Sequence, residues 1–498
     1  MIYVLDFGSQ YSHLITRRIR ELGVFAELVP PHISLDKLKN ANGIILSGGP
    51  QNLSDSDALR VDKKIFTLNI PLLGICYGMQ LTAFELSGRV KAGKKREYGP
   101  TEIKISKSPL FQGLKTNQMT WMSHGDQVVK MPKGFAKIAS SSNCPISAMA
   151  DNFRKIYGLQ FHPEVVHTKN GMKILKNFLK ITGAKKTWSM KDFVRQEIAK
   201  IKKQVGNDKA ICALSGGVDS AVAAKIVSQA IGKNLICIYV DTGLMRQDET
   251  RQIQKAFKNL RVVRSKKEFL KKLNGVTDPE KKRKIIGELF IRIFEREAKS
   301  IKNAKWLVQG TLYTDAISSG VSIGKTAALI KSHHNVGGLP KKFGFRLIEP
   351  LRELYKDEVR KIGKILGLPL AIVHRQPFPG PGLAVRIIGA VTDEKLNLLK
   401  PADAIVREEI EKAGLDVQQY FAVIPDIRSV GVQGDFRTYG YPIIVRAITT
   451  KDFMTAHWAQ IPYPVLEKIS VRITNEVPGV NRIVYDITSK PPGTVEWE

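Results

Sequence analysis

The sequence has no apolar run that approaches the roughly 20 residues a membrane-spanning helix needs. Its first residues, 1–6, lack the basic start and the long apolar segment of a signal peptide, and they are expected to form the first strand of a domain. We therefore expect a cytoplasmic protein without a membrane segment. No internal repeat and no long low-complexity segment occurs, so repeat and fibrous architectures are not expected.

Cysteine is scarce, with four residues in a chain of 498: Cys76, Cys144, Cys212 and Cys237. No two of them form a Cys-x-x-Cys pair, which argues against a zinc site and against a disulfide framework. Cys212 and Cys237 lie inside apolar runs and are expected in the core.

Acidic residues are few relative to basic ones, 46 against 78, which leaves a net charge of +32. Such a charge could attract nucleic acid or another polyanion. The basic residues are scattered along the whole chain, however, and no basic tail, aromatic-interleaved patch or nucleic-acid motif occurs. We therefore expect a lysine-rich solvated surface that suits anionic nucleotide substrates, and no nucleic-acid partner.

What the sequence does contain is typical of a globular protein, with 43% hydrophobic and 25% charged residues. The length predicts two to four domains, and we expect three, at residues 1–184, 185–375 and 376–498. The last boundary falls at a hinge rich in proline and glycine, residues 376–383.

Apolar strands alternate with helical stretches in the first two domains. Strands are expected at residues 3–7, 43–46, 71–75, 235–240 and 306–309. A helix is expected over 12–22, with Ser12 as its N-cap. This alternation predicts two α/β domains with mainly parallel sheets, whose sites lie at the carboxyl ends of strands. The third domain has short strands and helical candidates at 403–412 and 465–476, which predicts a small α+β domain.

One polar turn stands between a short buried strand, 210–214, and a helix, 221–231. The turn reads Ser215-Gly216-Gly217-Val218-Asp219-Ser220. Its glycines let the backbone approach a ligand closely, and the amides at the helix N-terminus point at an anion. Ser215 and Ser220 add hydroxyl donors, and Asp219 adds a carboxylate where Mg²⁺ would sit beside phosphates. No Gly-Lys-Ser/Thr ends the turn, so it is not a Walker loop.

Cys76 stands in a Gly-x-Cys-x-Gly layout, between Gly74 and Gly78. A sharp strand-to-helix turn of this kind exposes the middle side chain, and the helix N-terminus behind it favours the reactive thiolate. Much later in the sequence, His162 and Glu164 are two positions apart, so in an extended segment both would project to one side. Glu164 can then hold the imidazole tautomer while His162 activates Cys76.

Together with Ser47-Gly48-Gly49-Pro50, this set of residues resembles the class I glutamine amidotransferases. The resemblance implies that Cys76 attacks the glutamine amide, that His162 is the base and acid, and that Glu164 orients it. Backbone amides near Gly49 and Tyr77 would meet the oxyanion.

Two more stretches resemble known families. The turn from Ser215 to Ser220 resembles the pyrophosphate loop of the N-type ATP pyrophosphatases, which implies that it binds ATP with Mg²⁺ at Asp219. Ser123-His124-Gly125-Asp126 resembles a stretch of the amidotransferases. There we expect His124 to give structural support and to do no chemistry.

The later part of the chain resembles the GMP synthetase family. The motifs that carry this resemblance are Lys331-Ser332-His333-His334, Gly431-Val432-Gln433-Gly434-Asp435-Phe436-Arg437, Asp452-Phe453-Met454-Thr455-Ala456-His457-Trp458 and the terminal stretch 489–498. The first motif implies a lid, in which Lys331, His333 and His334 help to close over the nucleotide. By themselves the two histidines could suggest a metal site, but adjacent residues rarely chelate one metal and no third ligand is evident.

The same resemblance implies where XMP binds. Arg283 would contact the XMP phosphate, Lys490 and Glu496 would contact XMP, and Asp435 and Arg437 would lie nearby. Chain ends normally fray, so an aromatic tail with two prolines is expected to dock. The third domain is also the family's dimer interface, which implies a homodimer.

The resemblance covers essentially the whole chain and implies a two-part reaction. ATP·Mg²⁺ would adenylate XMP and release pyrophosphate, and ammonia from glutamine would displace AMP to leave GMP. Two alternatives stay open. One is an enzyme of the same parts, a thiolase or amidase acting on tRNA or a small acid, against which the Lys490 to Glu496 motif argues. The other is a regulatory nucleic-acid binder on an inactive scaffold, against which four intact residues argue: Cys76, His162, Glu164 and Asp219.

Overall fold

The structure is a computed structural model, and it describes residues 1–257, 259–313, 344–450, 453 and 455–498. The chain forms two compact units, Met1–Asp192 and Phe193–Glu498. The expected lid residues Lys331, His333 and His334 lie outside the described residues. The division into three domains stays a prediction.

The first unit is built on one nine-stranded sheet with the order β2-β1-β3-β4-β9-β8-β7-β5-β6. Its strands are β1 (Ile2–Leu5), β2 (Ala26–Val29), β3 (Gly43–Leu46), β4 (Leu72–Ile75), β5 (Arg89–Ile105), β6 (Asn117–Lys130), β7 (Ala136–Ser140), β8 (Ala148–Asp151) and β9 (Ile156–Leu159). Its helices are α1 (Ser12–Glu21), α2 (Leu35–Leu38), α3 (Tyr77–Glu85) and α4 (Gly171–Thr182).

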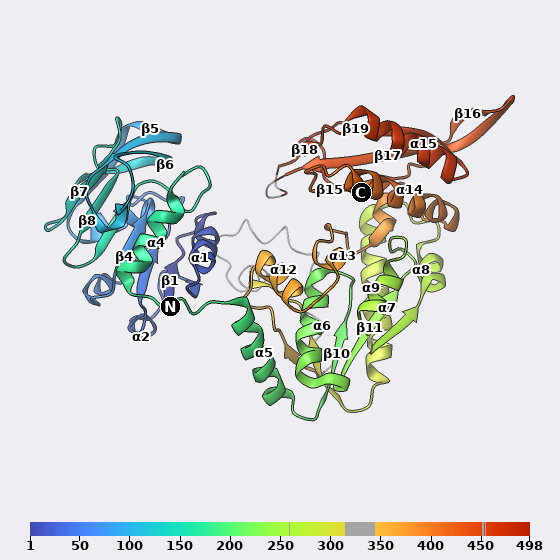
Figure 1. Cartoon of the computed structure of the whole chain (residues 1–498), viewed down its shortest axis with the longest axis horizontal. Coiled ribbons are helices and arrows are strands. Elements are labelled where there is room, and N and C mark those ends of the chain that lie inside the picture. Colours follow the sequence, from blue (N-terminus) through green and yellow to red (C-terminus); the bar gives the residue numbers. More distant parts are fainter. Residues whose placement is uncertain (258, 314–343, 451–452, 454) are drawn as a thin grey trace. The chain divides into compact units, whose positions relative to one another are not determined.

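The predicted parallel sheet is confirmed for five of these strands, from β2 to β9, whereas β8, β7, β5 and β6 extend the sheet in antiparallel pairs. Strands β1, β3 and β4 are apolar and buried along their whole length, as strands covered on both faces must be. Helices α1 and α4 pack together (Figure 1), and α3 packs on β4 and β9.

The expectation that Ser12 caps the first helix is wrong. Tyr11 occupies the cap position, and Ser12 is the first helical residue. Its hydroxyl lies 2.7 Å from Oδ1 of Asp6 and 3.0 Å from Oγ of Ser47. Ser12 therefore ties the ends of β1 and β3 together instead of capping its own helix.

The second unit begins with a five-stranded, all-parallel sheet in the order β12-β11-β10-β13-β14. Its strands are β10 (Lys209–Ala213), β11 (Leu235–Asp241), β12 (Leu260–Arg264), β13 (Ala304–Val308) and β14 (Arg346–Ile348). The helices around it are α5 (Met190–Val205), α6 (Val218–Ile231), α7 (Glu249–Ala256), α8 (Lys266–Leu273), α9 (Pro279–Lys299), α12 (Lys356–Ile365) and α13 (Leu370–Val373).

The C-terminal part of the second unit is a mixed sheet centred on β17, as the expected α+β domain requires. Its elements are α14 (Asp393–Lys412), β15 (Gln419–Val423), β16 (Ser429–Gln433), β17 (Phe436–Thr449), β18 (His457–Trp458), α15 (Tyr463–Glu476) and β19 (Val480–Asp486). Strands β15, β16 and β18 pair with β17 in antiparallel fashion, and β19 pairs with it in parallel. One hydrophobic core continues across the predicted boundary at residue 376, because it joins Ile238 and Leu289 to Val406 and Val445.

Helix α14 begins ten residues before the expected start at Asp403. Thr392 caps it by accepting a hydrogen bond from the Lys395 amide at 3.2 Å, and Pro401 lies inside the helix. Proline lacks the N–H that continues a helix, so the first half of this segment did not predict one.

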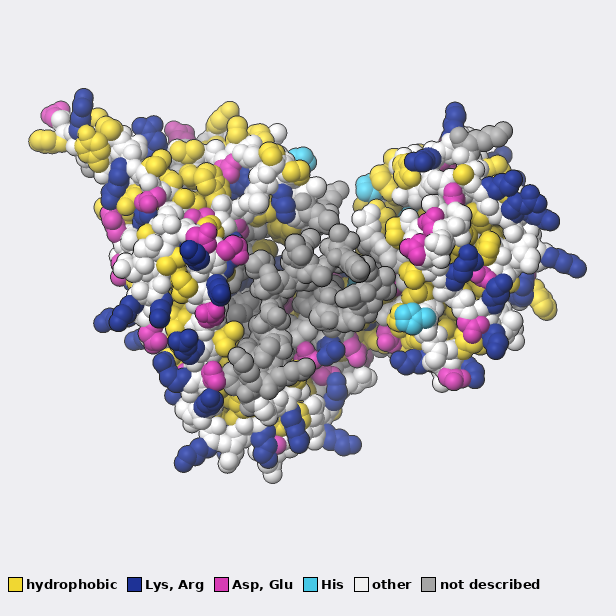
Figure 2. Space-filling model, turned by 180° about the vertical axis from the view of Figure 1, so that it is seen from behind, with side chains coloured by type: hydrophobic (Ala, Val, Ile, Leu, Met, Phe, Trp, Pro, Cys, Tyr) yellow, Lys and Arg dark blue, Asp and Glu magenta, His cyan; other side chains and the backbone are white. Residues whose placement is uncertain are grey.

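Lysine and arginine side chains are scattered among acidic and apolar ones on the face of each unit that Figure 2 shows, in agreement with the solvated surface expected from the charge. Among the described residues, no helix is both long enough and apolar enough to cross a bilayer.

Candidate active site

Cys76 occupies a strained turn between β4 and α3. Its φ of +51° lies in the left-handed region, which non-glycine residues seldom adopt. A Cβ added to Gly74 would lie 2.4 Å from the carbonyl oxygen of Gly78, and one added to Gly78 would lie 2.3 Å from that of Leu46. Both glycines are therefore required by close backbone approach, and together they hold Cys76 at the start of α3.

His162 and Glu164 come together as the sequence predicted, although the segment forms a turn and not an extended strand. Nδ1 of His162 lies 2.7 Å from Oε1 of Glu164, and both side chains are buried. Burial opposes the charged imidazolium, but the Glu164 carboxylate and the adjacent Cys76 side chain outweigh it and hold the pKa of His162 well above its ordinary value. The three residues thus form a Cys–His–Glu triad with Nδ1 engaged by the carboxylate, as nucleophilic catalysis requires.

The loop from Ser47 to Gly49 packs against this triad. A Cβ added to Gly48 would lie 3.2 Å from Cε1 of His162, and one added to Gly49 would lie 3.3 Å from Cγ of Tyr77. The Gly78 amide donates to the Ser47 carbonyl at 3.1 Å, which fixes the loop to the first turn of α3. Because Tyr77 is the first residue of α3, its amide has no acceptor within the helix. The loop and the helix N-terminus therefore meet where the oxyanion hole is expected.

Replacing Glu164 by glutamine should lower the pKa of His162. The carboxylate raises that pKa in the folded state, so its contribution to the free energy of unfolding is full below about pH 6.5 and is lost as the pH rises through the folded-state pKa. We therefore expect the stability difference between wild type and Glu164→Gln to shrink with rising pH. NMR titration of the His162 ring and denaturant unfolding at several pH values measure the two effects. Glu21→Gln, on the outer side of α1, is the control, and an unchanged His162 pKa in Glu164→Gln would contradict the assignment.

The predicted phosphate loop connects β10 to α6. Gly216 has a φ of +78°, and a Cβ there would lie 2.4 Å from Nη1 of Arg375 and 2.5 Å from Oε1 of Glu249. The hydroxyl groups of Ser215 and Ser220 lie 3.2 Å apart, and the Ser220 hydroxyl also accepts from the Ser215 amide at 3.3 Å. The loop is therefore a tight, pre-shaped turn that leads into the N-terminus of a 14-residue helix.

Asp219 has the donor atom that a hard cation requires. Its Oδ1 is buried and has no hydrogen-bond partner among the described residues, and its Oδ2 pairs with Nζ of Lys356 at 2.5 Å. A buried carboxylate oxygen without a partner is costly unless a ligand satisfies it. Oxygen is also the ligand atom that Mg²⁺ prefers, so the residues present fit this ion.

Sequence reasoning missed the residues that support this loop from far along the chain. Arg375 donates to the Gly216 carbonyl and pairs with Glu249 at 2.8 Å. Lys356, which pairs with Asp219, begins α12. Neither stands in a glycine-rich or otherwise conspicuous pattern, and only the packing of α12 and α13 on α6 identifies them.

The C-terminal tail docks, as expected. The Glu496 carboxylate accepts two hydrogen bonds from Arg386, at 2.9 and 3.0 Å, and a third from Gln419 at 2.9 Å. Lys490 exchanges backbone hydrogen bonds with Ala456. The buried Arg386 was missed because a single arginine after a proline-rich hinge carries no pattern.

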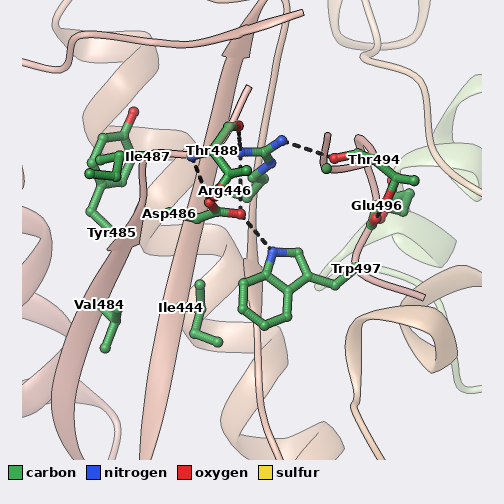
Figure 3. Close-up of a pocket in the computed structure, with 11 residues that line it drawn as sticks. Ile444, Arg446, Val484, Tyr485, Asp486, Ile487, Thr488, Thr494, Glu496 and Trp497 are labelled. Atoms are coloured by element: carbon green, nitrogen blue, oxygen red, sulfur yellow. Dashed lines mark hydrogen bonds and ion pairs between the residues drawn. The ribbon is translucent and has the colours of Figure 1, made fainter. Parts of the chain in front are cut away.

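A pocket of about 430 Å³ lies beside this tail. Arg446 and Asp486 from the sheet and Trp497 from the tail point into it (Figure 3). Arg446 pairs with Asp486 at 3.2 Å and donates to the Thr494 carbonyl at 2.9 Å, and Nε1 of Trp497 donates to Asp486 at 2.9 Å. The pocket therefore combines an aromatic wall with charged groups.

The residues expected at XMP fall into two groups in the structure. Arg283 reaches the tail and donates to the Glu498 carbonyl at 2.5 Å, and Nζ of Lys490 donates to the Phe453 carbonyl at 2.7 Å. Asp435 and Arg437 are exposed at the turn of the β16–β17 hairpin, which projects from the rest of the unit (Figure 1).

The length of β17 separates these groups. The tail binds β15, which pairs with residues 444–448 of β17, whereas Arg437 pairs near the opposite end. Residues 437 and 448 stand 11 positions apart in a strand, or about 36 Å at about 3.3 Å per residue. One chain therefore does not bring Asp435 and Arg437 to its own tail.

Three family models match the sequence in chain order. Residues 3–182 match the family described as glutamine amidotransferase class-I, residues 187–283 match NAD synthase, and residues 408–497 match the GMP synthase C terminal domain.

Full-length relatives share more than half of their residues with this chain. A protein of Caldicellulosiruptor saccharolyticus named GMP synthase (glutamine-hydrolyzing) is 57% identical over 510 residues, which cover 100% of this chain and 99% of the relative. A protein of Geobacillus kaustophilus with the same name is 56% identical over 509 residues with the same coverage. Among solved structures, a putative GMP synthase subunit from Thermoplasma acidophilum is 36% identical, with a TM-score of 0.34, over 36% of this chain and 93% of that one.

Proposed function

The chain belongs to the family of glutamine-hydrolysing GMP synthases, and we propose that it converts XMP to GMP with ATP and with nitrogen taken from glutamine. The observation that carries the proposal is the presence, in one chain, of a Cys–His–Glu triad and a pre-shaped phosphate loop with a buried carboxylate oxygen. The first supplies a nitrogen donor, and the second binds the nucleotide that activates the acceptor.

In the first half of the reaction, Cys76 attacks the carboxamide of glutamine. Because Nδ1 of His162 is engaged by Glu164, its other ring nitrogen is left to take the thiol proton and to return it to the leaving ammonia. The amides near Gly49 and Tyr77 stabilise the oxyanion, and water then releases glutamate. Ammonia has to be made within the enzyme because free ammonia at neutral pH is mostly ammonium.

In the second half, residues Ser215 to Ser220 hold the phosphates of ATP at the N-terminus of α6. Asp219 would hold Mg²⁺, which neutralises phosphate charge when bound. Lys356 adds a cation on the same side of the loop. The 2-oxygen of XMP attacks the α-phosphate, pyrophosphate leaves, and ammonia displaces AMP from the adenylated base.

XMP is placed near the C-terminal tail by this proposal. Support comes from Arg283, which reaches the tail, and from Lys490 and Glu496, which the tail itself carries. Glu496 is oriented by the bidentate Arg386, so its position does not depend on a flexible chain end.

A homodimer through the β16–β17 hairpin is also proposed. The exposed apolar side chains of this hairpin are Val430, Val432, Phe436 and Tyr439, of which Phe436 is 78% exposed. The projecting hairpin carries them at the upper left of Figure 2. Exposed apolar patches of this kind mark interaction surfaces. A partner copy would cover these side chains, and Asp435 and Arg437 would then lie at the interface. The cytoplasmic location stays a prediction.

The experiment that tests the function is an assay for AMP and GMP from XMP and ATP·Mg²⁺, with either glutamine or an ammonium salt as nitrogen source. We expect both products in equal amounts with either source, because each adenylated XMP ends as one AMP and one GMP. ATP consumption that requires tRNA and ignores XMP would instead support the tRNA-directed alternative, which the comparisons do not favour.

A further inference from the structure

Two buried glutamines, Gln80 and Gln160, stand beside the thiol of Cys76 and are not part of the triad. Gln160 is fully buried and Gln80 is 4% exposed. Nε2 of Gln160 lies 3.7 Å from Sγ of Cys76, and its Oε1 lies 3.3 Å from Nε2 of Gln80. Gln80 follows Cys76 by four positions, so the first turn of α3 brings both residues to one side.

A backbone carbonyl sets the direction of these hydrogen bonds. Nε2 of Gln80 lies 2.8 Å from the carbonyl oxygen of Asp126, which can only accept. Gln80 must therefore direct its NH₂ group to Asp126, and the second N–H of that group reaches Oε1 of Gln160. With its oxygen engaged in this way, Gln160 directs its own NH₂ group to the sulfur of Cys76.

A second buried pair holds the Asp126 carbonyl in place. Nδ1 of His124 donates to the same oxygen at 3.0 Å, and Nε2 of His124 lies 3.1 Å from Oε2 of Glu97. On the same strand, the Ser123 carbonyl accepts from the Cys76 thiol at 3.5 Å. His124 thus has the supporting position that the sequence suggested, at the base of the hydrogen-bond chain.

We propose that Gln160 is a further catalytic residue of the glutamine site, whose side-chain N–H binds Sγ of Cys76 and stabilises the thiolate. Hydrogen bonds to a charged acceptor are stronger than those to a neutral one, so the N–H favours the thiolate over the thiol. Gln80 and the Asp126 carbonyl keep the amide in the productive orientation. The inference rests on the proposed role of Cys76 as the nucleophile.

Replacing the neutral amide of Gln160 leaves the titratable groups around Cys76 in place. His162 and Glu164 face it from the segment after β9, and His124 with Glu97 lies behind it on β6 and β5. A substitution that removes only the amide of Gln160 therefore isolates the effect of its N–H.

The test is the pH dependence of Cys76 alkylation by iodoacetamide in the full chain without glutamine, located by mass spectrometry. Gln160→Met keeps the length of the side chain and removes the donor. We expect the alkylation midpoint to rise by about one pH unit, a tenfold change in the ionisation constant. The midpoint is read and not the rate, because a thiolate of higher pKa is intrinsically more nucleophilic. Gln118→Met, at another buried glutamine of the same unit, should leave the midpoint unchanged.

An unchanged midpoint in a folded Gln160→Met variant would overturn the inference, with folding checked by circular dichroism and thermal unfolding. If that variant does not fold, Gln80→Met decides, because it leaves Gln160 in place but no longer orients its amide. We expect a smaller upward shift there, and no shift would again overturn the inference. Failure of the proposed nucleophile role of Cys76 would give a different result. In that case Cys76→Ala would retain glutamine-dependent GMP formation, whatever the alkylation midpoint of the Gln160 variant.

Discussion

Replacing Cys76 by alanine should abolish glutamine-dependent GMP formation and leave ammonium-dependent formation intact. In the proposed reaction Cys76 supplies the sulfur that attacks the carboxamide, and alanine has no nucleophilic group to replace it. Loss of a nucleophile in a comparable triad lowers kcat on the order of 10⁴- to 10⁶-fold. The phosphate loop belongs to the other compact unit and does not use this thiol, so adenylation of XMP should proceed.

The measurement compares initial rates of GMP formation with glutamine and with an ammonium salt, at saturating XMP and ATP·Mg²⁺. Cys144→Ala is the matched control, because Cys144 is a buried cysteine of the same unit. It should keep both rates. Glutamine-dependent synthesis that survives in Cys76→Ala would show that the triad is assigned wrongly.

Replacing Asp219 by alanine should stop GMP formation with both nitrogen sources. The substitution removes the buried carboxylate oxygen that fits Mg²⁺, and it leaves the ammonium group of Lys356 unpaired beside the loop. Charge stabilisation by a bound metal is worth several kcal/mol, so the loss of adenylation should be about 10³-fold or greater. Glutamine hydrolysis by the first unit has no direct need of this residue.

AMP formation from XMP and ATP, measured across a Mg²⁺ titration, reads this effect directly. Asp208→Ala is the control, because Asp208 precedes β10 at the end remote from the loop and pairs with Lys305 at 2.9 Å. We expect wild-type rates from it. Adenylation at an unchanged rate and with an unchanged Mg²⁺ requirement in Asp219→Ala would refute the metal role.

The local geometry around Cys76 and around His162 explains why the sequence could predict both parts of this candidate site. Positions 74 and 78 require glycine, because a Cβ at either one would lie only 2.4 or 2.3 Å from a backbone carbonyl oxygen, so the spacing of the two glycines around Cys76 has a steric cause. The pairing of His162 with Glu164 was predicted from their separation of two positions in an extended segment. The structure contains this pair, although the segment is a turn.

The sequence predicted less where a partner lies far away without a pattern. Lys356 and Arg375 stand more than 130 residues from the loop that they contact, and single basic residues in a chain of net charge +32 carry no signal. The antiparallel extension of the first sheet was also missed. The predicted helix at 403–412 was shorter than α14. Pro401 lacks the N–H that continues a helix, so the residues before it were not predicted as helical.

The sequence by itself predicted the local features of the two candidate sites: the tight turn at Cys76, the pairing of His162 with Glu164, and the glycine-rich loop from Ser215 to Ser220. Each depends on glycines or polar groups at short, fixed spacings, because a turn or a helix N-terminus is built from neighbouring residues. The tertiary structure alone decided what surrounds these groups. It placed Gln160 against the sulfur, left an oxygen of Asp219 without a partner among the described residues, and separated Arg437 from Glu496 by the length of β17. Such relations arise from packing between distant segments, whose contacts leave no spacing for a sequence to display.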